Sequence, residues 1–394
     1  MKQQSAMIPY GRQSISEKDI QAVREILRSD FLTQGPAVPA FEGAVSRYCQ
    51  AREAVASNSG TSSLHLACLA LGVGSGDRVW TSPITFVASA NCARYCGADV
   101  EFIDIDQDTG NISIKALRNR LRAAAQNNTL PKVVIPVHFA GQPCDMEAIH
   151  ALGLEYGFEI IEDGCHALGA RYYDQPVGNC RYSAITVFSF HPVKIITTGE
   201  GGLATTNSRQ LAEKMRLLRS HGITRDADRM VNRSDGPWYY EQLALGFNYR
   251  MTDIQAALGI SQLERLDRFV QKRNALARRY DRLLAEAGLP VTPLARQPDR
   301  LSSFHLYVVR VRTDVVRQQH REIFTALRDR GIGVNLHYIP VYHQPYYNNP
   351  TREIETCPGA EQYYASAITL PLYPDLEEHE QDRVVQTLTE VIGP

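Results

Sequence analysis

The sequence predicts an α/β fold in which a mostly parallel sheet is covered by helices on both faces. In the first half of the chain, short apolar runs alternate with amphipathic helical patterns. These runs are nearly continuous, which is typical of parallel strands buried on both faces. The last third changes to a long helical pattern followed by a strand and a helix. A chain of 394 residues can form a large and a small domain, and we expect them at 1–250 and 251–394.

The first helix is expected at 20–27, where Ser16 and Asp19 resemble an N-terminal capping pair. The next helices are expected at 62–71, which Gly72 ends, and at 87–96, 114–126 and 146–156. The strands are expected at 77–81, 100–105, 132–137, 159–162, 185–189 and 202–205. Ligands of such sheets bind at the carboxyl ends of the strands, so functional residues are expected in the loops there.

The C-terminal part is predicted to be an α+β domain. One long helix is expected at 252–287, ended by Pro290 and Pro293, followed by a strand at 305–311 and a helix at 318–330 closed by Gly331. The segment 224–242 is charged and interrupted by Gly and Pro, which predicts a long loop. Loops of that length inside compact domains are usually functional or mobile.

Composition excludes several classes of protein. A net charge of -1 gives no global attraction to nucleic acid or to an anionic membrane, and no helix-turn-helix pattern or basic stripe is present. The longest apolar runs, such as 133–137, are too short to cross a bilayer. The N-terminus lacks the apolar core of a secretion signal, so a cytoplasmic protein is expected. The eight cysteines form no C-x-x-C pair, which favours buried thiols, and no metal site is predicted.

A lysine stands between a predicted strand and a glycine-rich stretch. Residues 188–194 read FSFHPVK, and 195–202 read IITTGEGG. Lys194 in this position can point into a pocket, where partial desolvation populates the neutral amine that a nucleophile needs. The alternative is a solvated surface charge.

Two further motifs accompany this lysine. The predicted strand at 159–162 delivers Asp163 to its carboxyl end, where a carboxylate can pair with a protonated ring nitrogen; the alternative is a cap on the next helix. The run 57–63, with Gly60, Thr61 and Ser62, directly precedes a predicted helix. Its unpaired backbone N–H groups and the helix dipole favour an anion such as phosphate, and plain N-capping is the alternative.

Together the motifs resemble the fold-type I enzymes that use pyridoxal phosphate (PLP), and within them the DegT/DnrJ/StrS family of sugar aminotransferases. The segments that carry the resemblance are 32–36, 81–86, 136–141, 160–169, 188–202, 246–253 and 337–346. The resemblance implies a mostly parallel seven-stranded sheet flanked by helices in the large domain. It also implies that Lys194 holds PLP as a Schiff base and that Asp163 faces the pyridine nitrogen.

The resemblance assigns further residues to the cofactor. Phe86 would stack on the pyridine ring, and His166 would lie near the phenolic oxygen. The phosphate would be bound by Gly60, Thr61, Ser62 and Ser189, and by Asn248 from a second subunit, which implies a homodimer. Local packing or capping is the alternative for each. Dehydratases related to this family carry a histidine in place of the lysine, so Lys194 favours transamination, while His191 stands three residues earlier.

The resemblance also implies the substrates. L-glutamate would be the amino donor, and the acceptor would be carbon 4 of a UDP-linked 4-keto-6-deoxy-N-acetylhexosamine, as in pseudaminic acid synthesis. An enzyme that makes UDP-4-amino-arabinose is the alternative. His337, Tyr338 and Tyr342 would face the sugar or uracil, or else form a packed surface. Arginines of the 224–242 segment would meet the diphosphate, or else be solvated: Arg225, Arg229 and Arg233.

The alternative from another functional class is a regulatory or binding homologue that has lost its catalytic activity. Such a protein is expected to have lost the lysine or the aspartate, and this sequence retains both Lys194 and Asp163. The sequence therefore predicts an enzyme with two small-molecule substrates and no nucleic-acid or membrane partner.

Overall fold

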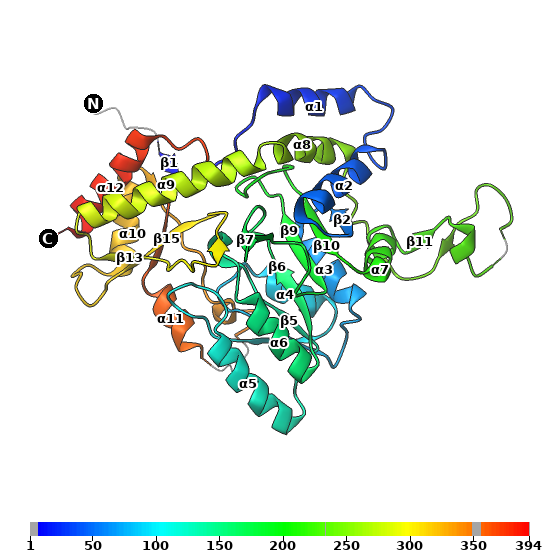
Figure 1. The fold of residues 1–394 in the computed structure, drawn as a ribbon, viewed down its shortest axis with the longest axis horizontal. Helices are drawn as coiled ribbons and strands as arrows, with labels where there is room; N and C mark the ends of the chain where they lie inside the picture. The colour runs from blue at the N-terminus through cyan, green and yellow to red at the C-terminus, as the bar shows by residue number, and fades with distance from the viewer. Residues whose placement is uncertain (1–6, 233, 349–355, 394) are drawn as a thin grey trace.

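The computed structural model describes residues 7–232, 234–348 and 356–393. The chain forms a large body around a seven-stranded sheet and a smaller body beside it, and the long helix α9 (Leu266–Glu286) extends from one to the other (Figure 1). No helix in these ranges combines the length and the apolar character needed to cross a membrane.

The central sheet confirms the predicted α/β class. Its strands are, in spatial order, β2 (Glu53–Ser57), β10 (Gly202–Thr206), β9 (Ile185–Ser189), β6 (Glu159–Asp163), β5 (Val133–Ile135), β3 (Arg78–Thr81) and β4 (Asp99–Phe102). Strand β10 runs antiparallel to both of its neighbours, while β9, β6, β5, β3 and β4 are mutually parallel. The carboxyl ends of β6 and β9 therefore meet at one edge of the sheet.

Helices cover both faces of this sheet. One face is covered by α2 (Ala37–Cys49), α5 (Ile114–Asn127), α6 (Met146–Tyr156) and α8 (Asp253–Leu263). The other is covered by α3 (Gly60–Ala70), α4 (Ala88–Tyr95) and α7 (Arg209–Arg219). Successive strand residues point to opposite faces, so Ile160 packs with α6 while Ile161 packs with α3. Both faces are apolar, which explains the nearly continuous apolar runs.

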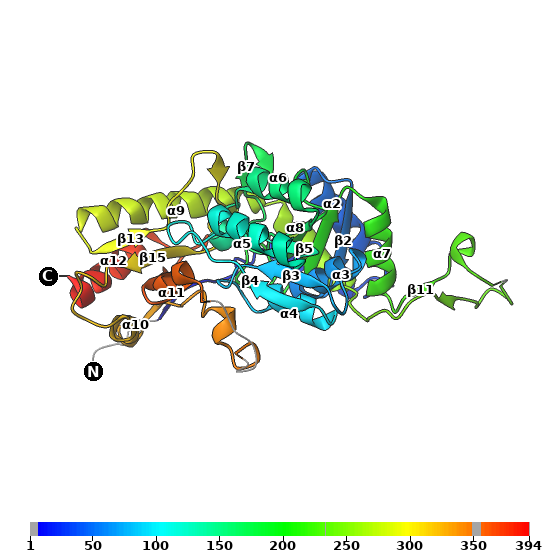
Figure 2. The same cartoon turned by 90° about the horizontal axis from the view of Figure 1, so that it is seen from below.

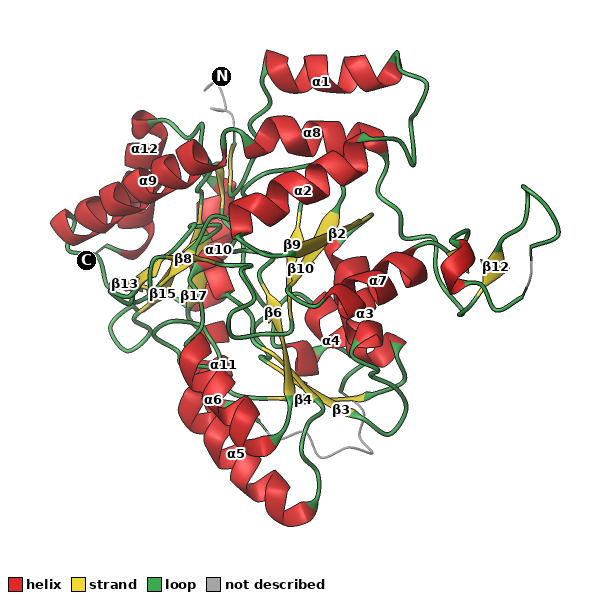
Figure 3. Ribbon diagram, turned by 45° about the vertical axis from the view of Figure 1, so that its right-hand side comes forward, coloured by secondary structure: helices red, strands yellow, loops and turns green. Residues whose placement is uncertain are grey.

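Helix α1 (Glu17–Leu27) lies outside α8, as Figure 3 shows. Its predicted cap is confirmed, because the Asp19 carboxylate accepts a hydrogen bond from the Ser16 backbone N–H at 2.7 Å. Asp19 is also buried against α8 and forms an ion pair with Arg265. The prediction of one helix over 252–287 is wrong: α8 ends at Leu263 and α9 begins at Leu266. The break lets α8 stay against α1 while α9 leaves in another direction and Arg265 reaches Asp19.

The small body combines an antiparallel sheet with helices. Its sheet consists of β13 (Val291–Pro293), β15 (Tyr307–Val311) and β17 (Ala367–Leu370). Its helices are α10 (His320–Asp329), α11 (Pro358–Tyr364), α12 (Glu378–Ile392) and the later turns of α9. The N-terminal strand β1 (Ile8–Pro9) also belongs here, because it pairs with β16 (Ile332–Gly333).

The predicted division at residue 250 stays a prediction. Helix α8 packs on α1 and α2 of the large body, and the buried side chains divide within α9. Phe269 and Val270 pack into the large body, whereas Ala277 and Tyr280 pack into the small one.

The remaining elements are short. A small sheet joins β7 (Arg171–Tyr172), β8 (Gln175–Pro176) and β14 (Arg300–Leu301), and 3-10 turns occur at Phe139–Gly141, Ala227–Arg229 and Val341–His343.

The predicted loop at 224–242 is the greater part of an arm that projects from the large body beyond α7 (Figures 1 and 2). Two short strands close its base, because β11 (Ile223–Thr224) pairs with β12 (Glu241–Gln242). The Glu241 carboxylate accepts hydrogen bonds from the backbone N–H groups of Val231 and Asn232, at 2.6 and 2.8 Å. The arm is therefore an organised hairpin. Arg233, one of its candidate cations, lies outside the described residues.

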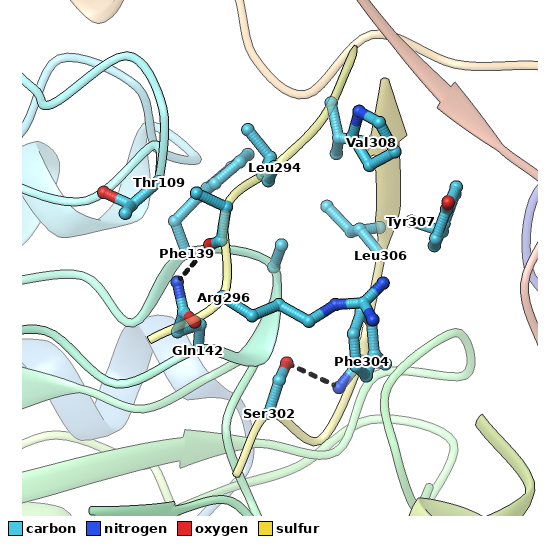
Figure 4. A pocket seen from close by; sticks show the side chains of 13 residues that line it. Thr109, Phe139, Gln142, Leu294, Arg296, Ser302, Phe304, Leu306, Tyr307 and Val308 are labelled. Carbon is cyan, nitrogen blue, oxygen red and sulfur yellow. Dashed lines mark hydrogen bonds between the residues drawn. The ribbon is translucent and has the colours of Figure 1, made fainter. Parts of the chain in front are cut away.

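The two bodies are joined by buried side chains and by Gln142. Its side-chain amide donates to the Ala295 carbonyl at 3.0 Å and accepts from the Gln297 backbone N–H at 3.0 Å. In Figure 4, Gln142 lies beside the loop after β13 that carries Leu294 and Arg296. This amide ties the loop after β5 to the small body.

Candidate active site

A cavity of about 820 Å³ lies where the carboxyl ends of β6 and β9 meet the N-terminus of α3. Both bodies line it, which is a common position for a ligand site in α/β proteins. Of the residues predicted for the site, those that line the cavity are Gly60, Thr61, Ser62, Phe86, Asp163, His166, Ser189, Lys194, His337 and Tyr338.

Lys194 enters the cavity from the turn that follows β9. Its backbone N–H donates to the His191 carbonyl at 2.9 Å, and the next two residues, Ile195 and Ile196, are buried. It is the only lysine among the described residues that line the cavity. Burial lowers the pKa of the Lys194 ammonium, and the nearby Cys165 and Asp163 oppose this shift. The position thus favours a neutral amine more than a surface position does.

Asp163 is the last residue of β6 and is buried. Its Oδ2 atom accepts a hydrogen bond from the Ser89 hydroxyl at 2.6 Å, and its Oδ1 atom accepts one from the Cys165 backbone N–H at 3.1 Å. These donors fix the orientation of the carboxylate. The helix-cap alternative is not supported, because the segment that follows Asp163 is a turn and not a helix.

The N-terminus of α3 forms the other end of the site. Ser59 is the N-cap, accepting a hydrogen bond from the Ser62 backbone N–H at 3.1 Å, and the Ser62 hydroxyl donates to Asn58 at 2.6 Å. Capping and cavity lining thus coexist at Ser62. A Cβ atom at Gly60 would lie only 2.9 Å from the Cβ of Ser189, so glycine lets Ser189 approach the helix terminus. Backbone N–H groups and a hydroxyl converge there, as an anion site requires.

His166 follows Asp163 by three residues and is buried in the cavity wall. Its Nε2 atom lies 3.1 Å from the Tyr338 hydroxyl, and its Nδ1 atom is buried with no hydrogen-bond partner among the described residues. Burial, followed by the nearby Lys194, lowers the pKa of His166 well below its usual value. A neutral imidazole therefore faces the site.

Sequence reasoning missed His305. This residue precedes β15 in the small body, yet its ring centroid lies 4.3 Å from that of His166. It lines the cavity, and its Nδ1 atom is also buried without a partner within the described part of the chain. One histidine before a predicted strand carries no signal of its own, because its function depends on how the two bodies meet.

The three predicted substrate-binding residues do not share one environment. His337 lines the cavity, and its Nδ1 atom lies 2.8 Å from the Thr369 hydroxyl. Burial lowers its pKa to about 3. Tyr338 reaches His166, as described above. Tyr342 is buried outside the cavity, where its hydroxyl donates to Glu361 at 2.6 Å, so the structure supports the packed alternative for that residue.

Phe86 and Asn248 are the remaining predicted residues. The Phe86 side chain is 58% exposed and lines the cavity, which leaves a ring face open to a ligand. Asn248 is exposed and does not line the cavity of its own chain, although its carbonyl accepts a 3.4 Å hydrogen bond from the Asn58 side chain. Within a single chain, Asn248 is therefore outside the site.

The donor set of this cavity fits pyridoxal phosphate. It offers an amine, a buried carboxylate, an open aromatic face and a helix terminus suited to phosphate. The buried, unpartnered Nδ1 atom of His166 adds a polar group that a bound ligand can satisfy. Within the described ranges, no group of three or more His, Cys, Asp or Glu side chains is placed to hold a metal ion.

Comparisons with known proteins agree with this geometry. The model of the DegT/DnrJ/EryC1/StrS aminotransferase family matches residues 13–389. The spore coat polysaccharide biosynthesis protein SpsC of Bacillus subtilis is 38% identical over 394 residues, covering 100% of this chain and 99% of that protein.

Solved structures give the same result. PseC of Helicobacter pylori, an aminotransferase of pseudaminic acid biosynthesis, superposes with a TM-score of 0.88 at 31% identity, covering 98% of this chain and 99% of its own. A proposed sugar aminotransferase of Streptococcus pneumoniae, solved in its PLP form, gives 0.86 at 31% identity and covers 98% of each chain.

Proposed function

The chain belongs to the DegT/DnrJ/EryC1/StrS aminotransferase family and is a pyridoxal-phosphate-dependent sugar aminotransferase, and from that premise we propose its substrates and the roles of its residues. The amino donor is L-glutamate. The acceptor is carbon 4 of a UDP-linked 4-keto-6-deoxy-N-acetylhexosamine, as in pseudaminic acid synthesis. The observation that carries the proposal is the convergence of Lys194, Asp163 and the α3 N-terminus on one cavity.

When bound, pyridoxal phosphate supplies an electron-withdrawing ring that accepts an amino group and passes it on. Eight residues of one chain hold it, in this proposal. Lys194 binds it covalently, and Asp163 pairs with its ring nitrogen. Phe86 covers one ring face, and His166 reaches the phenolic oxygen. Ser189, the backbone N–H groups of Gly60 and Thr61, and Ser62 beside them hold the phosphate.

Lys194 is also the residue that moves the proton. Once the donor amine has displaced it, its Nζ atom is a free amine inside the cavity. Burial favours the neutral form of that amine, which can therefore take a proton from one carbon and return it to another. His166 and Tyr338, whose side chains lie 3.1 Å apart, form part of the cavity wall around this transfer.

The sugar nucleotide binds at the mouth of the same cavity. His337 and Tyr338 line it from the small body and offer ring faces and polar atoms to a sugar. Arg225 and Arg229 of the arm supply cations for the diphosphate. In the structure, the arm projects away from the body that carries it, so these arginines serve the site of a second subunit in our proposal.

A homodimer completes the site. The arm and the segment after it expose large apolar side chains, among them Val231 at 81%, Trp238 at 74% and Leu245 at 82%. Such side chains on a projecting hairpin favour burial against another chain. Asn248 lies at the end of this segment and outside its own cavity, so we place it at the phosphate of the partner.

A mixed-dimer experiment tests this arrangement. Lys194→Ala and Asn248→Ala subunits, each of low activity alone, are unfolded and refolded together. If Asn248 acts across the interface, each mixed dimer contains one intact site and activity returns. If the mixture stays as inactive as its parents, Asn248 acts within its own chain or not at all.

The substrate is tested with a panel of UDP- and dTDP-linked 4-keto sugars and ¹⁵N-labelled L-glutamate. The proposal expects ¹⁵N in the sugar product, with the UDP-linked 4-keto-6-deoxy-N-acetylhexosamine giving the highest kcat/KM. Preference for the UDP-linked 4-keto pentose would favour the UDP-4-amino-arabinose alternative instead. If the protein transfers nitrogen from another amino donor and not from glutamate, the donor assignment is overturned.

A further inference from the structure

Two buried hydroxyl groups stand behind the Asp163 carboxylate. The Ser89 hydroxyl donates to Asp163 Oδ2 at 2.6 Å, and the Thr85 hydroxyl lies 2.7 Å from that of Ser89. Thr85 is 3% exposed and Ser89 is 1% exposed, so water does not replace either contact. Thr85, Ser89 and Asp163 therefore form a continuous chain of short hydrogen bonds along the cavity wall, and all three line the cavity.

The chain has a direction, because each hydroxyl has one proton to donate. Ser89 gives its proton to the carboxylate, which is its nearest acceptor and the charged one. The proton between the two hydroxyls must then come from Thr85. The order Thr85 to Ser89 to Asp163 satisfies both hydroxyl protons, with Oδ2 of Asp163 as the final acceptor.

A protonated Asp163 would disturb this order. If its proton lay on Oδ2, Ser89 would have to accept it and turn its own proton elsewhere. Turned to Thr85, at 2.7 Å, that proton would leave the Thr85 proton without an acceptor among the described residues. Turned to the Phe86 carbonyl, it would form a hydrogen bond of 3.3 Å, longer than the 2.6 Å bond to the carboxylate. The geometry is therefore best satisfied when Oδ2 is the final acceptor.

The surroundings of Asp163 are otherwise weakly charged. The groups that face it from neighbouring elements are Cys165 and Lys194 of the large body and Tyr338 of the small one. Burial raises the pKa of the Cys165 thiol and of Tyr338, so both stay neutral. Only Lys194 carries a proton that could balance the carboxylate, and burial disfavours that charge. Hydrogen bonds must therefore supply the remaining stabilisation of the carboxylate.

The same turn also positions Phe86. The backbone N–H of Ser89 donates to the Phe86 carbonyl at 3.2 Å, while its hydroxyl proton goes to Asp163. One turn at the start of α4 (Ala88–Tyr95) therefore fixes an aromatic side chain and a carboxylate that both line the cavity.

We propose that Thr85 and Ser89 are positioning residues whose hydrogen-bond relay holds Asp163 as an acceptor oriented for the ring nitrogen of the cofactor. Neither hydroxyl touches the cofactor in this proposal, which rests on the proposed role of Asp163. The relay makes the protonated ring nitrogen, and with it the electron demand of the ring, depend on two hydroxyl groups of the cavity wall.

The test uses the full-length protein loaded with pyridoxal phosphate labelled with ¹⁵N in the ring. The readouts are the ¹⁵N chemical shift, which reports protonation of that nitrogen, and the dissociation constant of the cofactor. The variants are Ser89→Ala, which removes the donor to Asp163, and Thr85→Val, which keeps the shape and leaves Ser89 in place. Ser82→Ala is the matched control, because Ser82 is also 1% exposed but its hydroxyl has no partner among the described residues.

Loss of a hydrogen bond to a charged group is expected to weaken cofactor binding about tenfold in Ser89→Ala and to move the ¹⁵N signal toward the unprotonated value. Thr85→Val is expected to move both readouts in the same direction by less, Ser89→Thr to restore them, and Ser82→Ala to leave them unchanged. Wild-type signals in both Ser89→Ala and Thr85→Val would overturn the relay alone. A wild-type protein with an unprotonated ring nitrogen would overturn the proposed role of Asp163 and the relay with it.

Discussion

The imidazole rings of His166 and His305 lie with their centroids 4.3 Å apart, although one follows β6 of the large body and the other precedes β15 of the small body. Each has a buried Nδ1 atom without a partner among the described residues. Burial lowers the pKa of both well below the usual value, and the nearby Lys194 lowers it further. The closed arrangement of the two bodies therefore depends on neutral histidines.

This pair predicts an acid-sensitive fold for the cofactor-free protein. Below pH 6.5 the unfolded chain binds protons at His166, His305 and His337, while the folded chain does not. The free energy of unfolding therefore decreases as the pH is lowered. For His337 the loss continues down to its folded pKa of about 3. Each histidine contributes a slope of about 1.4 kcal/mol per pH unit. Urea unfolding at intervals between pH 6.5 and 5 measures this slope.

In the variant His305→Asn, the unfolded chain should bind one proton fewer in this pH range. Its slope in the same pH range is expected to be smaller than that of the wild type by about 1.4 kcal/mol per pH unit. His379→Asn is the control, because the His379 side chain is 75% exposed on α12. Equal slopes for all three proteins would show that His305 does not stay neutral in the folded state.

The variant Gly60→Ala tests whether close packing at the N-terminus of α3 is needed to bind the phosphate. Replacing it with alanine places a Cβ atom 2.9 Å from the Cβ and 3.2 Å from the hydroxyl of Ser189, so Ser189 or the start of α3 must move. The dissociation constant for pyridoxal phosphate is expected to rise about tenfold or more. Gly74→Ala, with no atom within 4 Å of the new Cβ, should bind like the wild type. If Gly60→Ala binds pyridoxal phosphate as tightly as the wild type, the phosphate does not lie at this position.

The variant Gln142→Ala tests how much the contact between the two bodies contributes to the free energy of unfolding. Gln142→Ala loses one hydrogen bond to each of Ala295 and Gln297, and both partners are backbone groups at the junction of the two bodies. The free energy of unfolding is expected to fall by about 2 kcal/mol. Gln21→Ala, which removes only an exposed contact to Glu25 on α1, should change it little. A loss for Gln142→Ala no greater than that for Gln21→Ala would show that the bridge adds no stability.

Much of the large body was predictable because its signals are local. The helix at 146–156 and the strand at 185–189 have the predicted bounds, since each combines a clear period with a capping residue or a glycine-rich neighbour. Lys194 and Asp163 were predictable for a related reason. Strand ends in a parallel sheet share one edge, so two chemically informative residues at those ends meet.

What the sequence did not reveal depends on contacts between distant segments. Arg265, in the break between α8 and α9, forms an ion pair with Asp19 of α1, a contact between segments far apart in the sequence. His305 enters the site only because β15 lies against the loop after β6. Tyr342 has the same residue type and neighbourhood as Tyr338, but its hydroxyl meets Glu361 in the interior. Alternation of aromatic residues alone does not distinguish these two positions.

The central claim is that Lys194 carries the cofactor, and peptide mapping after borohydride reduction tests it most directly. Reduction fixes pyridoxal phosphate to the lysine that holds it, and mass spectrometry of the digested protein then locates the added mass. We expect the label on the peptide that contains Lys194, and no label in Lys194→Ala. A label on any other lysine, or an unchanged label in Lys194→Ala, would contradict the account.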